Sequence, residues 1–277
     1  MGIYRDERYN IHGTMVAQYT TVLDLFPVWG LFLIVVVLVT AAIEGGYRLG
    51  NYRHRQSARE MEAPVGAMVG ATLGLLAFML AFTFGMAASR FDTRKQLVLD
   101  EANAIGTTYL RAAMLPERRD EIRALLRSYV DARLDAVQSG RVAEQILKSE
   151  DLQGQLWSQA TAIGLQHPDS IVVGLFVTSL NEVIDLHATR VTAALRNRIP
   201  GAIWVALLTM ALLSLAAMGY HAGLAGTSRS LVIIVVAVTF SAVIALVAAL
   251  DRPTAGTLAV SQQALIDLRQ SMSPPEK

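Results

Sequence analysis

The feature that most constrains this chain is a set of four long runs that contain no Asp, Glu, Lys or Arg. A helix needs about 20 apolar residues to cross the ~30 Å hydrocarbon core of a bilayer. Lipid offers the backbone no hydrogen-bond partners, so a spanning run must form a helix that satisfies its own backbone groups. The runs are Leu25–Ile43, Ala63–Ser89, Ile199–Ser228 and Ser230–Leu250. We therefore expect an all-α integral membrane protein with four transmembrane helices.

The composition agrees with a surface that partly faces lipid. Hydrophobic residues make up 53% of the chain and charged residues only 17%, against roughly 25% charged residues in a typical soluble domain. The sequence has no cysteine, which excludes a disulfide, a thiolate nucleophile and a cysteine-based metal site. A net charge of +1 gives no reason to expect a nucleic-acid partner. On these grounds the lipid bilayer itself is the first expected partner.

The segment between the second and third runs, residues 90–198, is predicted to be a helical bundle outside the membrane. Its apolar residues recur at helical spacing and show no strand-like alternation. Breaks at Pro116, Ser139–Arg141 and His167–Ser170 divide it into four predicted helices. No proline or glycine cluster separates Phe91 from Thr108. The second transmembrane helix is therefore expected to continue into the bundle as one helix.

The apolar runs and the helix breaks divide the chain into five predicted parts. The run Ile171–Leu180 is apolar but only ten residues long, too short to span a bilayer, so it is expected to be a buried helix of the bundle. Lys and Arg are equally frequent beside the two ends of the spans, so they do not decide which side the bundle occupies. The predicted parts are an N-terminal tail (1–24), spans one and two (25–89), the bundle (90–198), spans three and four (199–250) and a C-terminal tail (251–277).

No catalytic signature is found in the sequence. The chain has no P-loop, GxGxxG turn, HExxH or GxSxG motif, and its five histidines are scattered, with no pair at ligand spacing. We therefore expect no enzymatic activity, no cofactor and no metal site. The four spans contain no clear internal acid or base, which argues against a proton-coupled transporter or pump.

The second span carries a stripe of small residues. Such a stripe lets membrane helices approach closely. Its members recur about once per helical turn, and three of them are candidate helix-packing residues: Gly66, Gly70 and Gly85. Packing against a neighbouring helix is the simplest interpretation of this stripe.

Two aromatic residues lie beside that stripe. Phe78 and Phe82 are one helical turn apart, with Gly74 one turn earlier. In a symmetric oligomer, these three positions could form rings around an axis and gate a pore by dewetting. In a single bundle, the phenylalanines would instead face the core or lipid. The spacing leaves both interpretations open.

Two longer stretches resemble a known family. "GLLAFMLAFTFGMAASRFDTRKQLVLDEANAIGTTYLRAAMLP" (Gly74–Pro116) is similar to the central motif of the bestrophin-like domain family of bacterial membrane proteins, and "ALDRPTAGTLAVS" (Ala249–Ser261) is a weaker match. The family is distantly related to bestrophins, which are pentameric anion channels with four spans per subunit. The resemblance implies that the second span lines a pore.

The resemblance also assigns roles to particular residues. It implies that Phe78 and Phe82 match the spaced phenylalanines of the bestrophin neck, with Gly74 in place of a bulkier residue. It further implies that polar residues of the continuing helix face the ion path or an interface: Asp100, Glu101, Asn103 and Thr107. The acidic cluster of animal bestrophins is absent after Asp251, so calcium gating is not expected.

An acidic ring favours cations over anions, so Asp100 and Glu101 leave the ion selectivity open. These two carboxylates could instead pair with Arg94, Lys95 or Arg111. The predicted function is an oligomeric ion channel, expected to be a homopentamer, that conducts small inorganic ions across the bacterial inner membrane. The alternative is a membrane-anchored sensor or scaffold whose helical bundle binds a partner or ligand without a pore. A carrier for a small solute is a third possibility.

Overall fold

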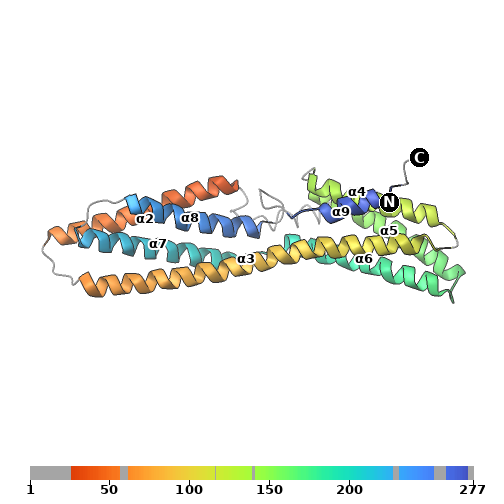
Figure 1. Cartoon of the computed structure of the whole chain (residues 1–277), viewed down its shortest axis with the longest axis horizontal. Helices are drawn as coiled ribbons and strands as arrows, with labels where there is room; N and C mark the ends of the chain where they lie inside the picture. The colour runs from red at the N-terminus through yellow and green to blue at the C-terminus, as the bar shows by residue number, and fades with distance from the viewer. Residues whose placement is uncertain are drawn as a thin grey trace, which may run out of the picture. The chain divides into compact units, whose positions relative to one another are not determined.

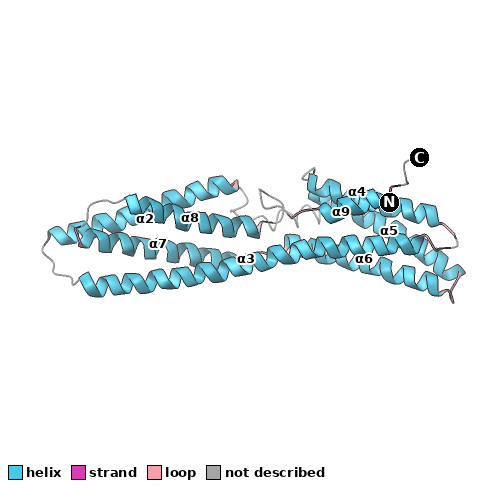
Figure 2. Cartoon of the chain, in the orientation of Figure 1, coloured by secondary structure: helices cyan, strands magenta, loops and turns pink. Residues whose placement is uncertain are grey.

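The computed structural model describes residues 26–56, 62–115, 117–138, 141–226, 231–252 and 260–273, and every regular element within them is an α-helix (Figures 1 and 2). The predicted N-terminal tail, Pro116 and most of the second family-like motif lie outside these residues. The helices are α2 (Val28–Arg55), α3 (Glu62–Ala112), α4 (Arg119–Gln138), α5 (Val142–Gln166), α6 (Ile171–Leu195), α7 (Gly201–Leu224), α8 (Leu231–Asp251) and α9 (Gln263–Ser271).

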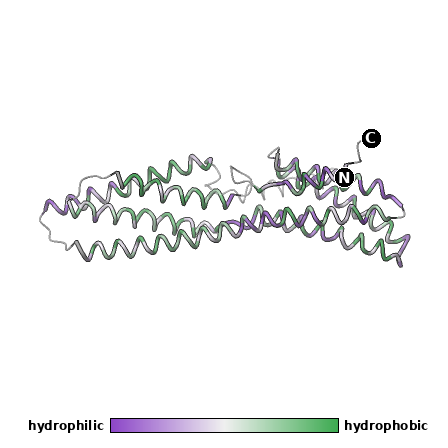
Figure 3. The backbone as a smooth tube through the Cα atoms, viewed as in Figure 1, coloured by the Kyte–Doolittle hydropathy of each residue, from purple (hydrophilic) through white to green (hydrophobic). Residues whose placement is uncertain are grey.

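The chain divides into two compact units. One, called the apolar unit below, comprises residues 21–90 and 198–258, and the other, called the bundle unit, includes residues 91–197 and 259–277. Figure 3 shows the difference in composition: α2, α7 and α8 are coloured mainly hydrophobic, whereas hydrophilic residues are interspersed along α4 and α5.

Helix α3 contributes residues to both units. It runs without a break through 51 residues, as the lack of a proline or glycine cluster after Phe91 predicts. At 1.5 Å per residue its axis is about 76 Å long, more than twice the ~30 Å thickness of a hydrocarbon core. A single helix of this length can both span a bilayer and form part of a water-exposed bundle.

The apolar unit is held together by helices that pack at very short range. Helix α2 contacts both α7 and α8, and it buries an apolar residue at every fourth position along one face: Leu31, Val35, Val39 and Ile43. This spacing keeps the four side chains on the same side of the helix. The other faces of α2 are apolar as well, and several of their large side chains are exposed in the single chain.

Glycines allow the backbones of α2 and α7 to touch. A Cβ atom at Gly46 or Gly50 of α2 would overlap a backbone carbonyl oxygen of α7, and one at Gly219 or Gly223 of α7 would overlap one of α2. All four positions therefore require glycine. Small residues are the usual device for close helix association in lipid, where the hydrophobic effect does not drive helices together.

The bundle unit has an apolar core of a soluble kind. Helices α4 and α5 pack against each other, α6 packs on α5, and α9 packs on α4. Helix α6 begins after Ser170, whose hydroxyl accepts a hydrogen bond from the amide of Val173 and caps the helix. The largest fully buried side chains of this core come from α3 to α6 and include Ile105, Leu126, Leu156, Phe176 and Leu180.

Helix α9 was not anticipated, because the sequence prediction treated residues 251–277 as a tail. Leu265 of α9 is fully buried, and the carbonyl of Met272, just after the helix, accepts a hydrogen bond from the hydroxyl of Tyr109. Arg269 pairs with Asp131 of α4. These contacts make residues 260–273 a part of the bundle core.

Among the described residues, five helices rather than four are apolar and long enough to cross a membrane. The additional candidate is α6, whose most apolar window has a mean hydropathy of 1.5, the lowest of the five. Its residues Val173, Phe176 and Leu180 are buried in the core of the bundle unit. The prediction of a buried bundle helix at Ile171–Leu180 therefore agrees with the packing, although Ile171 itself is 80% exposed.

Candidate functional site: the faces of helix α3 and a buried charge cluster

The predicted neck residues lie on an exposed face of α3. Phe78 and Phe82 are 65% and 58% exposed in the single chain, and nothing lies within 4 Å of a Cβ placed at Gly74. The opposite face of the same segment is buried through Leu76, Leu80 and other residues. In a membrane-spanning helix, such an apolar face contacts either lipid or a helix of another subunit.

The predicted helix-packing glycines of α3 do not form the closest contacts of the chain. Nothing lies within 4 Å of a Cβ placed at Gly70 or Gly85, and a Cβ at Gly66 would meet only the ring of His221, at 2.9 Å from its Nε2. Backbone contact occurs instead between α2 and α7. Gly70, Gly74 and Gly85 of α3 are thus open to another helix and make no close contact within one chain.

In the bundle unit the predicted polar residues of α3 separate into two groups. Asn103 and Thr107 are exposed. Asp100 is half-buried and accepts a hydrogen bond at 2.8 Å from Gln96, one turn earlier. Glu101, in contrast, is fully buried. The four residues are therefore not brought together at one place.

Glu101 is the centre of a buried charge cluster formed by α3, α4 and α6. One carboxylate oxygen lies 3.0 Å from Nε of Arg133 on α4, and the other forms an ion pair with Arg190 on α6. Arg190 also donates a hydrogen bond to the side chain of Gln262 in the segment before α9, at 3.2 Å. A single carboxylate thus joins three helices and, through Arg190, the C-terminal segment.

Tyr129 of α4 extends this cluster. Its hydroxyl donates to Glu101 at 2.8 Å, and the same oxygen accepts a hydrogen bond from Gln153 of α5 at 3.3 Å. Nδ1 of His187 lies 3.2 Å from this oxygen. The only hydroxyl proton of Tyr129 is donated to Glu101. In the contact with His187 the tyrosine oxygen is therefore the acceptor, and the donated proton is on Nδ1 of His187. Burial, and then the charge of Glu101, hold the pKa of Tyr129 well above its usual value of 10.0.

The sequence prediction missed the partners of Glu101. Lys95 is exposed, and Arg111 donates to the backbone carbonyl of Leu175 at 2.7 Å. The actual partners, Arg133 and Arg190, follow Glu101 by 32 and 89 residues. The available signal was a charged residue in the middle of an apolar helical stripe, which indicates a buried ion pair but does not identify the partner.

A second cluster ties the helix ends of the apolar unit together at Asp251, in the second family-like motif. Its carboxylate accepts a hydrogen bond from the amide of Ile199 at 2.9 Å, just before α7, and lies 3.9 Å from side-chain nitrogens of both Arg90 and Arg198. The neighbouring Arg252 donates to the carbonyl of Phe26 at 2.8 Å. The described start of this motif therefore connects helix ends, and its residues 253–259 lie outside the described residues.

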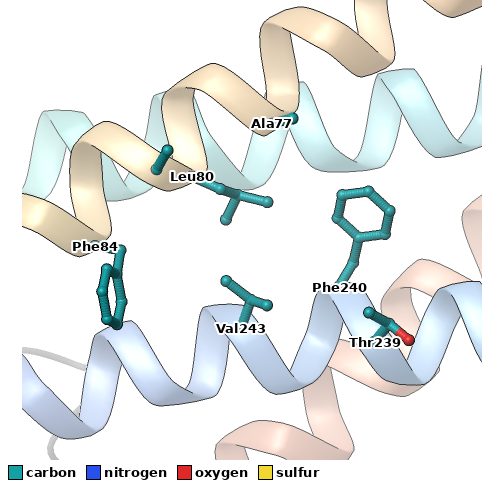
Figure 4. A pocket seen from close by; sticks show the side chains of 7 residues that line it. Ala77, Leu80, Phe84, Thr239, Phe240 and Val243 are labelled. Carbon is teal, nitrogen blue, oxygen red and sulfur yellow. The ribbon is translucent and has the colours of Figure 1, made fainter.

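A shallow groove of about 300 Å³ lies between α3 and α8 in the apolar unit (Figure 4). Leu80 and Phe84 of α3 and Val243 and Phe240 of α8 lie around it. The only polar side chain of its lining is Thr239, whose hydroxyl donates to the backbone of its own helix. Such a lining offers no groups that would fix a polar solute.

The fold and these features define a helical integral membrane protein, and comparison with known proteins identifies its family. The family model for the Bestrophin-like domain matches residues 30–265. The chain belongs to this family, as its two motifs indicated. A comparison with curated proteins gave no match.

Two solved structures share the fold. One is the crystal structure of a variant of a bacterial bestrophin homologue from Klebsiella pneumoniae, with a TM-score of 0.63 and 15% sequence identity over 88% of this chain and 97% of that chain. The other is the crystal structure of a membrane-protein variant, with a TM-score of 0.61 and 15% identity over 87% and 95% of the two chains. At this identity the similarity establishes the arrangement of the helices.

Proposed function

We propose that the protein is an oligomeric ion channel, a homopentamer, whose pore is lined by the exposed face of α3. Membership of the Bestrophin-like domain family and the shared fold support this function. Four helices would span the bacterial inner membrane: α2, the first part of α3, α7 and α8. The bundle unit, with α6 buried in it, would lie in water. The permeant species are small inorganic ions.

The observation that carries this proposal is the exposure of Phe78 and Phe82. Helix α3 packs on one face and presents two phenylalanines one turn apart on the other, and this second face is open to lipid or to a neighbouring copy. Copies arranged around an axis would bring these side chains together as two apolar rings, which can close a pore by excluding water. The open positions at Gly70, Gly74 and Gly85 lie on the same helix and would let neighbouring copies approach.

Ion flux from liposomes tests this function. Purified protein is reconstituted with separate anion and cation gradients, and wild type is compared with Phe78→Ala and Phe82→Ala. Because each substitution widens an apolar constriction, we expect both to increase flux severalfold, and the gradient that drives the larger flux gives the selectivity. Trp29→Ala is the matched control, since Trp29 is an equally exposed aromatic residue (69%) on α2.

The outcome distinguishes a pore from an ordinary membrane anchor. Flux that rises in the two phenylalanine variants and not in Trp29→Ala supports a neck at these positions. If correctly assembled wild type and both variants conduct neither anions nor cations, the pore is excluded.

A membrane-anchored sensor or scaffold is the second candidate, favoured by exposed apolar residues of the bundle unit. Leu165 and Ile171 are 79% and 80% exposed, and Leu110 is 70% exposed. A partner that binds the bundle would cover such residues. In that case Leu165→Glu and Ile171→Glu would abolish partner binding. Liposomes holding wild type or either variant would be equally impermeable to ions. A carrier is the least supported function, because α2, α3, α7 and α8 are continuous, whereas carriers use broken helices at their sites.

A further inference from the structure

The buried charge cluster places a directional constraint on α3 in addition to its apolar packing. Around Glu101, the bundle-facing side of α3 carries both large and small buried residues, among them Ile105, Ala102 and Ala104. Because apolar contact is non-directional, the packing of these side chains constrains the rotation of the helix less sharply than an ion pair does. A carboxylate held by two guanidinium groups fixes this rotation directly.

The geometry around the helix relates this cluster to the opposite face. Successive residues of an α-helix are separated by 100°, so Asn103 and Thr107 lie roughly 200° and 240° around the axis from Glu101. These two residues are exposed, whereas Glu101 and Thr108 are fully buried. A rotation of α3 by one residue position would withdraw Glu101 from Arg133 and Arg190.

That displacement would leave three buried charges uncompensated. Removing one partner from a buried ion pair is strongly destabilising, because the remaining charge is neither hydrated nor paired. The energetic gain of the intact pair over an apolar replacement is small, so its advantage is that it excludes alternative arrangements. Here the arrangement that it selects is the rotational setting of α3.

We propose that Glu101 is a positioning residue that fixes the rotation of α3, so that Asn103 and Thr107, and not Thr108, face the water-filled ion path. The reference to an ion path rests on the proposed channel function, whereas the rotational setting does not. Tyr129 and Arg190 act with Glu101, because they hold its two carboxylate oxygens from two different helices.

Cysteine accessibility tests this inference, and the native sequence suits the method because it contains no cysteine. Single variants Asn103→Cys, Thr107→Cys and Thr108→Cys are made in the full-length assembled protein and treated with a small water-soluble thiol reagent. In the native background, we expect Thr108→Cys to react at least about tenfold more slowly than the other two, because a buried thiol reacts only after local opening.

The same three cysteines are then placed in a Glu101→Gln background. If Glu101 fixes the rotation, the difference between Thr108→Cys and Asn103→Cys falls to roughly twofold or less, as α3 samples several settings. Asp100→Asn is the matched control, since Asp100 is the neighbouring carboxylate and bonds only to Gln96 on its own helix among the contacts described. In the Asp100→Asn background, the roughly tenfold difference in reactivity between Thr108→Cys and Asn103→Cys should be retained.

A second variant covers the case in which Glu101→Gln does not fold. The triple substitution Glu101→Leu, Arg133→Leu and Arg190→Leu removes the whole cluster and leaves no charge buried without a partner, which is frequently tolerated. It is expected to fold and to lose the difference in reactivity. A folded triple variant that keeps the native pattern overturns the proposal, because apolar packing would then suffice.

Two further results would also overturn the proposal. If Glu101→Gln merely lowers the yield, and the folded fraction keeps the native pattern, Glu101 has a structural role only and the proposal is wrong. If Asn103→Cys and Thr107→Cys both resist labelling in the native background, they face protein and not water, which overturns the proposed orientation. The labelling pattern is measured independently of conductance, so an absence of flux would refute the channel without affecting the rotational setting.

Discussion

The apolar unit and the bundle unit hold their helices in register by opposite means. In the apolar unit, Gly46 and Gly50 of α2 meet the backbone of α7 directly. In the bundle unit, the carboxylate of Glu101 binds arginines of two other helices. Close backbone contact suits helices in lipid, where van der Waals packing replaces the hydrophobic effect. In water, apolar burial supplies stability, and a buried charge adds specificity.

The largest expected effect is at the glycine interface between α2 and α7. In Gly46→Val the new side chain would overlap the backbone carbonyl of Ala216. Because neither helix backbone can yield as a flexible side chain could, we expect a loss of stability of about 3 kcal/mol or more and little folded protein. The measurement is the thermal unfolding midpoint of the purified protein in detergent.

The neighbouring glycine provides the control for this prediction. Gly45 has nothing within 4 Å of its Cβ position, and valine has a slightly higher helix propensity than glycine, so Gly45→Val is expected to change the stability by less than about 1 kcal/mol. Equal destabilisation by the two substitutions would show that α2 and α7 do not approach at Gly46.

The next largest effect is expected at the buried charge cluster of the bundle unit. Glu101→Leu leaves Arg133 and Arg190 buried without their counter-charge, and we expect a loss of about 3 kcal/mol. Adding Arg133→Leu and Arg190→Leu should restore most of it, because no buried charge then remains. Unfolding midpoints of the single and triple variants measure this. If the triple variant is less stable than the single one, the cluster contributes to stability and the contrast between the two units is smaller than proposed.

The two units also differ in how much of them could be predicted from the sequence. The uncharged runs locate α2, α7 and α8, and the continuity of α3 follows from the absence of helix-breaking residues after Phe91. The close packing of α2 and α7 was missed, although Gly46 and Gly50, like Gly219 and Gly223, are four residues apart. A longer small-residue stripe on α3 attracted attention instead, and periodicity cannot tell which of two stripes meets a partner within the same chain.

In the bundle unit, the helices were predictable but their connections were not. Glu101 was recognisable as a charge within an apolar stripe, yet its partners lie on α4 and α6 and depend on tertiary packing. Helix α9 has only nine residues, and its apolar positions Leu265 and Leu268 are too few for a periodic pattern to be distinguished from a tail. Short segments and long-range ion pairs both require the three-dimensional structure.

The smallest expected effect is on the pH dependence of the free energy of unfolding, to which the charge cluster contributes through Tyr129. The raised pKa of Tyr129 means that the folded protein holds this proton more tightly than the unfolded chain does. The corresponding stability is fully present below the unfolded tyrosine pKa of about 10 and is lost as pH rises beyond it towards the folded pKa, at up to about 1.4 kcal/mol per pH unit.

Tyr129→Phe removes this proton together with the hydroxyl that joins Glu101, Gln153 and His187. At pH 8 we expect a loss of about 1–3 kcal/mol, because buried polar groups are left unsatisfied. Between pH 10 and 11.5, however, thermal unfolding midpoints should fall less steeply in the variant than in wild type. Tyr52→Phe is the control, since Tyr52 is exposed on α2. If Tyr129→Phe and wild type decline with the same slope, ionisation of Tyr129 is not linked to unfolding, and the cluster would have to open to water before the fold is lost.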